Sequence, residues 1–221
     1  MDSARDRILE RLGKIKPVHI PERIEMPPPY EAEFSREELI EKFAAKLTEQ
    51  TGVFHRAADR EGALEVLKEI AEEEKLTCIM ASENGLVNSL NLPEWGKAHG
   101  ITVFFPHDFE ETGAYKDAVF NKADAGVTAA DFAVAESGTL AIIHDRNNAR
   151  LLSLAPIFHI AVVDIDHVVP VYETVIESAY NTGDLPSHVT FITGPSMTGD
   201  IQGQMFKGMH GPRKLAVILI G

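Results

Sequence analysis

The sequence predicts an α/β protein with a mostly parallel sheet covered by helices on both faces and an antiparallel hairpin inserted into it. The first indication is that helical periodicity alternates with apolar runs of five or six residues, as expected for strands buried on both faces. The second is a pair of short apolar segments, residues 132–135 and 139–143, joined around Ser137 and Gly138, which is typical of a hairpin. A chain of 221 residues can bury such a core without a disulfide or a structural metal.

The first 34 residues differ from the rest of the chain in composition and in hydrophobic periodicity. Residues 2–13 form a short amphipathic helical pattern with Ile8, Leu9 and Leu12 on one face. Residues 17–30 are rich in proline, which excludes regular helix and central strand and predicts an extended connector. We therefore divide the chain into an arm and connector (1–34) and an α/β domain (35–221). The arm either lies along its own domain or embraces a second subunit to form a homodimer.

The domain opens with a capped helix. Ser35 and Glu38 have the spacing of a capping box, apolar residues then recur at helical spacing, and Thr51-Gly52 closes the helix. The remaining expected elements follow in chain order: strand 53–56, helix 60–74, strand 77–81, a short helix around Trp95, strands 101–105, 125–128, 132–135, 139–143 and 159–163, helix 167–179, and strands 189–193 and 214–220.

Charge and cysteine content exclude several classes of function. The net charge of −13 argues against nucleic-acid binding, which depends on neutralising phosphates. Residues 138–221 carry only −2 of this charge, so a small anion can approach this third of the chain. The single cysteine, Cys78, cannot hold an iron–sulfur cluster. The charged N-terminus leads into no long apolar segment, so we expect a cytoplasmic protein without a membrane span.

The candidate site lies in the last third, where three glycine-containing segments, residues 135–139, 192–196 and 209–212, each adjoin an apolar run. Loops at strand ends are where α/β proteins place ligands. Each segment also has a structural interpretation. Glu136 is either a catalytic carboxylate or an acceptor for turn amides, and Arg150 is either an anion ligand or an exposed loop residue.

The other two segments leave similar alternatives. The loop that begins at Thr193 suits an oxygen-rich ligand, especially if a helix starts near Thr198, but it is also compatible with an ordinary strand-to-helix turn. His210 is either an acid/base group or a hydrogen-bonding loop residue. The histidines show no close metal-ligand spacing, so no metal site is expected.

Residues 126–140 resemble a segment of the lactate-utilisation domain family, specifically its C-type members. Residues 152–156, 159–163, 193–196, 200–201 and 210–212 follow in the order that this family shows. The resemblance covers about residues 35–221. It implies a Rossmann-like α/β sandwich related to the ribose-phosphate isomerase, glucosamine-phosphate deaminase and CoA-transferase group of folds. It also implies a role in the bacterial oxidation of L-lactate to pyruvate together with iron–sulfur partner proteins, which would carry the clusters; no cofactor is then expected on this chain.

From these residues we predict a pocket between the Glu136 hairpin and the Thr193 loop that binds a small carboxylate or a cofactor anion. The predicted catalytic residues are Glu136 and His210. The predicted ligand-binding residues are Ser137, Gly138, Thr139, Arg150, Thr193, Gly194, Ser196 and Asp200. Two alternatives stay open: a non-catalytic assembly subunit, and a free-standing phosphosugar or acyl-CoA enzyme of the same fold.

Overall fold

The computed structural model describes residues 4–14, 33–145, 148–180, 186–199 and 205–221. Residue contacts divide the chain into two units, residues 1–31 and 32–221. In the first unit, α1 (Ala4–Gly13) confirms the predicted amphipathic helix, and Ile8, Leu9 and Leu12 on it are exposed. The predicted connector at 17–30 lies outside the described residues.

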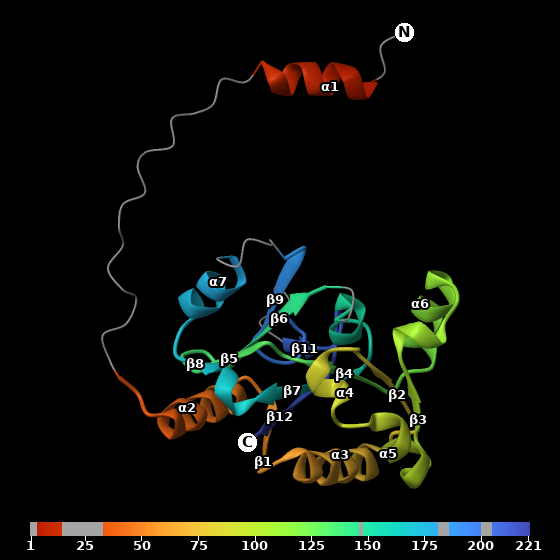
Figure 1. Ribbon diagram of the computed structural model, residues 1–221, viewed down its shortest axis with the longest axis vertical. Helices are drawn as coiled ribbons and strands as arrows, with labels where there is room; N and C mark the ends of the chain where they lie inside the picture. The colour runs from red at the N-terminus through yellow and green to blue at the C-terminus, as the bar shows by residue number, and fades with distance from the viewer. Residues whose placement is uncertain (1–3, 15–32, 146–147, 181–185, 200–204) are drawn as a thin grey trace. The chain divides into compact units, whose positions relative to one another are not determined.

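The second unit is built on a sheet of six parallel strands in the order β1-β12-β7-β4-β2-β3 (Figure 1). The strands are β1 (Val53–Ala57), β2 (Cys78–Ala81), β3 (Thr102–Phe104), β4 (Ala125–Ala129), β7 (Phe158–Asp164) and β12 (Lys214–Ile220). Every residue of the central strand β4 is buried, whereas the edge strands β1 and β3 are partly exposed. The apolar runs therefore have the burial that a doubly covered parallel sheet requires.

Helices cover one face of this sheet, and a second sheet and further helices cover the other. On the first face, α3 (Arg60–Glu74), α4 (Gly85–Asn88) and α5 (Leu92–His99) pack against Ile79, Ile160 and Ile218. On the opposite face, α2 (Arg36–Glu49) and the second sheet pack against Ala161 and Val217. Figure 1 shows α3 and α5 below the main sheet and the second sheet above it.

The second sheet has four strands in the order β8-β5-β6-β9. Its members are β5 (Phe132–Val134), β6 (Thr139–His144), β8 (Val168–Val169) and β9 (His188–Ile192). Strands β5 and β6 form the predicted antiparallel hairpin, with Val134 opposite Thr139. Strand β9 extends it on the β6 side, and the short β8 pairs in parallel with β5.

The structure departs from the expected local structure at three places. The helix expected over 167–179 begins only at Tyr172, as α7 (Tyr172–Tyr180), because Val168 and Val169 pair with Ala133 and Val134 before Pro170. Thr198 lies in β10 (Met197–Gly199), paired with β11 (Met205–Lys207). The helix α6 (Thr112–Asn121) was not predicted. In the first case, pairing with a distant segment overrides the local pattern.

The predicted start of α2 is confirmed. The Ser35 side chain accepts the Glu38 backbone N–H, and the Glu38 carboxylate accepts the Ser35 backbone N–H at 2.8 Å, which completes the capping box. Three short 3₁₀ helices complete the described elements: η1 (Pro106–Asp108), η2 (Arg150–Ser153) and η3 (Ile165–His167). Gly126 of β4 lets η2 approach the sheet, since a Cβ there would lie 2.1 Å from the Leu152 carbonyl oxygen.

Candidate functional site

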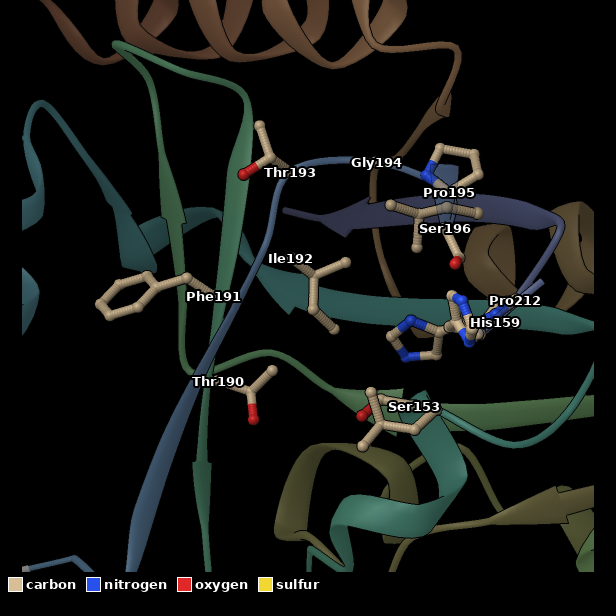
Figure 2. Close-up of a pocket in the computed structure, with 14 residues that line it drawn as sticks. Ser153, His159, Thr190, Phe191, Ile192, Thr193, Gly194, Pro195, Ser196 and Pro212 are labelled. Atoms are coloured by element: carbon tan, nitrogen blue, oxygen red, sulfur yellow. The ribbon is translucent and has the colours of Figure 1, made fainter. Parts of the chain in front are cut away.

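A pocket of about 230 Å³ lies where the segment after β9 meets the segment before β12. Figure 2 shows Thr190, Ile192 and Thr193 along one side, and Ser153, His159, Ser196 and Pro212 along the other. His210, Gly211, Leu154 and Leu215 also line it. Four of the residues predicted to form the site, Thr193, Gly194, Ser196 and His210, therefore share one pocket.

This pocket lies near the amino ends of two central strands of the parallel sheet. His159 is the second residue of β7, and Leu215, its register partner, is the second residue of β12. Ligands of open α/β sheets usually bind beyond the carboxyl ends of the strands. Here the second sheet and the loops around 194 and 211 instead form the walls of a pocket at the opposite end.

His159 is the most unusual residue in the wall. Its side chain is 0% exposed, and its Nε2 shares a hydrogen bond of 2.8 Å with the hydroxyl of Thr128. Its Nδ1 has no hydrogen-bond partner among the described residues. Burial disfavours the charged imidazolium and lowers the pKa of His159 to about 3, so the ring is neutral at physiological pH.

Backbone hydrogen bonds join the two glycine-containing loops beside the pocket. The Ser196 N–H donates to the Pro212 carbonyl at 2.8 Å, and the Gly208 N–H donates to the Ser196 carbonyl at 2.8 Å. Gly211 allows close contact, since a Cβ there would lie 3.1 Å from the Ser196 Cβ. The predicted convergence of residues 193–196 with 210–212 is therefore present in the structure.

The hairpin residues lie outside this pocket and form a cluster of hydroxyl groups. The Thr139 Oγ1 accepts a hydrogen bond from Ser137 at 2.9 Å and lies 2.7 Å from the Tyr172 hydroxyl and 2.9 Å from the Thr193 Oγ1. Thr139 is fully buried. Its hydroxyl is thus occupied by protein partners, and only Thr193 of this cluster also lines the pocket.

Glu136 is exposed and accepts the Tyr172 backbone N–H at 3.1 Å, at the start of α7. A carboxylate at this place satisfies a free amide of the first helical turn and interacts favourably with the helix dipole. Glu136 does not line the pocket described above. Its catalytic role stays a prediction, and its observed contact matches the structural interpretation.

Two predicted ligand-binding glycines pack against the end of α2. A Cβ on Gly138, which has φ +68°, would lie 2.2 Å from the Leu47 backbone nitrogen. A Cβ on Gly194 would lie 2.8 Å from the Gln50 carbonyl oxygen. Close approach of backbone segments therefore explains both glycines without a ligand.

Arg150 and Asp200 are the remaining predicted ligand-binding residues. Arg150 is exposed at the first position of η2 and is not part of the lining. Asp200 lies outside the described residues. Among the described residues that line the pocket, none is Asp, Glu, Lys or Arg. Within the described residues, no group of three or more His, Cys, Asp or Glu is arranged to hold a metal ion.

Sequence reasoning did not select His159 or Ser153 as site residues. The available signal was a histidine near the start of the otherwise apolar strand 158–163, which is uncommon in a doubly buried strand. That signal does not reveal which nitrogen lacks a partner, because the Thr128 contact depends on how β4 and β7 lie side by side.

The fold and the pocket define an α/β protein with an uncharged ligand-sized site between a parallel sheet and a smaller mixed sheet. Residues 40–220 match the family model of the LUD domain, and the chain belongs to this family. "Lactate utilization protein C 1" of Bacillus mycoides is 29% identical over 188 residues, which cover 81% of this chain and 80% of that protein.

Other relatives match over a shorter segment. "Lactate utilization protein C" of Oceanobacillus iheyensis is 33% identical over 112 residues, and the match spans 49% of this chain and 48% of that protein. The chain thus matches about half the length of this relative. A solved structure of a DUF162 family protein from Deinococcus radiodurans shares the fold, with a TM-score of 0.58 and 24% identity over 86% of this chain and all of that one. Among the described residues, no helix is long and apolar enough to cross a membrane.

Proposed function

We propose that this protein is a component of a cytoplasmic bacterial system that oxidises L-lactate to pyruvate together with iron–sulfur partner proteins. Within that system, its pocket binds a small carboxylate or a cofactor anion. The observation that carries the proposal is a pocket lined by Thr193, Gly194, Ser196 and His210 in a chain whose relatives are named for lactate utilisation. The relation to the CoA-transferase group of folds is part of the same proposal.

Because the chain has one cysteine, we assign the iron–sulfur clusters of this system to the partner proteins. Cys78 is the single cysteine of the chain, and its side chain is half-buried. Iron–sulfur clusters are held by several cysteine thiolates. Burial, with a smaller effect from Asp124, also raises the pKa of the Cys78 thiol and disfavours the thiolate that a metal would bind. Electron-transfer clusters therefore belong on the partner proteins in this proposal.

A set of exposed apolar side chains beside the pocket supports contact with a partner. These side chains are between 37% and 64% exposed and come from the segments that surround the pocket: Leu154, Ile157, Met197, Phe206 and Met209. Exposed apolar patches on soluble proteins often mark interaction sites. We call this set the apolar rim.

The ligand part of the proposal is tested by calorimetric titration with L-lactate, pyruvate and CoA esters. Ser196→Ala should weaken the binding of the ligand that fits by about three- to tenfold, because it removes one hydroxyl from the pocket. Glu136→Gln is the matched control, since Glu136 lies outside the lining and should leave affinity unchanged. Weaker binding only in Glu136→Gln would contradict this pocket and favour the predicted catalytic carboxylate.

The apolar rim favours a second candidate, a non-catalytic assembly subunit. Met209→Gln should weaken co-purification with the iron–sulfur partners while leaving ligand affinity unchanged, since Met209 is 64% exposed, does not line the pocket and is replaced by an uncharged side chain of similar size. Full lactate oxidation by partners in the absence of this chain would exclude an essential assembly role. Turnover of phosphosugars or acyl-CoA esters by the isolated chain would instead favour a free-standing enzyme of the same fold.

A further inference from the structure

We propose that His159 recognises the oxygen on carbon 2 of a short 2-hydroxy or 2-oxo carboxylate, whose carboxylate group lies at the mouth of the pocket beside Ser196 and His210. This inference rests on the proposed function, because it specifies how the same pocket distinguishes its ligand from other small carboxylates. It assigns a binding role to a residue that the sequence motifs did not single out.

The buried imidazole ring of His159 has one nitrogen without a hydrogen-bond partner among the described residues. The Thr128 hydroxyl engages Nε2 at 2.8 Å, and Nδ1 has no partner within the described part of the chain, although His159 is 0% exposed and lines the pocket. Buried polar atoms of native proteins are nearly always hydrogen-bonded, and exceptions often mark functional positions. A ligand oxygen supplies the missing partner after the small side-chain adjustments that commonly accompany binding.

A neutral imidazole can form a hydrogen bond with either a 2-hydroxy acid or the corresponding 2-oxo acid. The Thr128 hydroxyl can donate to Nε2 or accept from it, so either nitrogen of the neutral ring can carry the proton. With the proton on Nε2, Nδ1 accepts a hydrogen bond from a 2-hydroxyl group. With the proton on Nδ1, the ring donates to a 2-oxo group. The same side chain can therefore bind a 2-hydroxy acid and the corresponding 2-oxo acid.

The lining of the pocket favours one orientation of the ligand. The described residues that line the pocket include no Lys or Arg, and His159 is neutral because burial lowers its pKa to about 3. A carboxylate buried against this wall would lose its hydration without gaining a counter-charge, which is costly. Ser196 is half-buried and His210 is exposed, so the charged end keeps contact with water on their side. The uncharged oxygen then faces His159.

Calorimetry with three probes, L-lactate, pyruvate and propionate, tests the recognition step. Propionate lacks the oxygen on carbon 2. The wild-type chain should bind L-lactate and pyruvate about tenfold more tightly than propionate, the difference expected for one good hydrogen bond. His159→Gln can still reach Thr128 but removes the nitrogen at the Nδ1 position, so this preference should disappear. His159→Asn keeps a polar group at that position and should retain part of it.

A readout on the wild-type chain makes the test independent of how the variants fold. In the ¹⁵N NMR spectrum of the full chain, pyruvate should shift the Nδ1 resonance of His159, and propionate should not. An unchanged preference in folded His159→Gln, or an unmoved Nδ1 signal with saturating pyruvate, overturns the inference and leaves the proposed function standing. If none of the three probes binds the wild-type chain, both the inference and the ligand part of the proposed function fail. Co-purification with the iron–sulfur partner proteins then tests the proposed partner role of this chain separately.

Discussion

At the scale of single residues, His159 shows what burial does to an ordinary side chain. It lies near the start of β7, which pairs with β4 and β12, and it is 0% exposed. The resulting loss of hydration lowers the pKa of the ring to about 3. The structure therefore holds a polar group that is uncharged at every physiological pH and available for one further hydrogen bond.

The lowered pKa of His159 predicts a specific dependence of stability on pH. Its pKa is about 6.5 in the unfolded chain and about 3 in the folded protein, so below pH 6.5 only the unfolded state takes up this proton. The free energy of unfolding should fall by up to about 1.4 kcal/mol for each pH unit between about 6.5 and 3. Urea unfolding at pH 7 and pH 5 should show a loss about 2 kcal/mol larger in the wild type than in His159→Asn.

His55 and His144 also have pKa values lowered, chiefly by burial, but both are present in wild type and variant. Their contributions therefore cancel when the two proteins are compared. If the free energy of unfolding of the wild type and of His159→Asn fell by the same amount between pH 7 and pH 5, His159 would not stay neutral in the folded state.

Gly138 allows a second residue-scale prediction. Gly138→Ala should lower the free energy of unfolding by roughly 2–4 kcal/mol. The reasons are that φ is +68° and that the new Cβ would lie 2.2 Å from the Leu47 nitrogen. Gly113→Ala in α6 is the matched control, since a Cβ at Gly113 meets nothing within 4 Å. The Gly113→Ala substitution should leave the free energy of unfolding unchanged or raise it. A similar decrease in both variants would show that backbone crowding at Gly138 is not the cause.

At the scale of elements, the hydroxyl of Thr139 connects three of them. Its partners Thr193 and Tyr172 belong to the segment after β9 and to α7, while Thr139 itself begins β6. Thr139 is fully buried, Tyr172 is half-buried and Thr193 is exposed, so these bonds are only partly shielded from water. The cluster thereby positions the Thr193 loop, which forms part of the pocket wall.

Removing this hydroxyl should loosen the packing of the three elements. Thr139→Val keeps the shape of the side chain but removes the shared partner of the Ser137, Tyr172 and Thr193 hydroxyls, so the free energy of unfolding should fall by about 0.5–1.5 kcal/mol in urea titrations. Thr102→Val, at an exposed position of edge strand β3, should change it by less than about 0.5 kcal/mol. No difference between the two variants would show that the hydroxyl cluster contributes no net stability.

At the scale of the whole molecule, the dominant electrostatic fact is the net charge of −13. Most of the described ion pairs, such as Lys97–Glu94 and Lys46–Glu49, lie on the surface, where such pairs contribute little. Repulsion among the remaining acidic groups should therefore outweigh these attractions. The charge favours solubility but opposes the compact state.

Salt should therefore stabilise this protein. Raising the NaCl concentration from about 0.02 to 0.3 M shortens the Debye length to well under 10 Å and screens the repulsion. The midpoint of thermal unfolding should rise by roughly 2–4 °C, which corresponds to about 1 kcal/mol. A fall in the midpoint, measured by circular dichroism, would show that the surface ion pairs dominate instead.

The sequence by itself determined the α/β class, the hairpin at 132–143 and the positions of most strands, because hydrophobic periodicity is a local property of the chain. It also located the Thr193 and His210 loops that line the pocket. Only the tertiary structure decided that Glu136 contacts α7, that Gly138 packs against α2, and that His159 lines the pocket and has a nitrogen without a partner among the described residues. The physical reason is that these facts depend on which distant strands pair and in what register, and local periodicity does not encode that information.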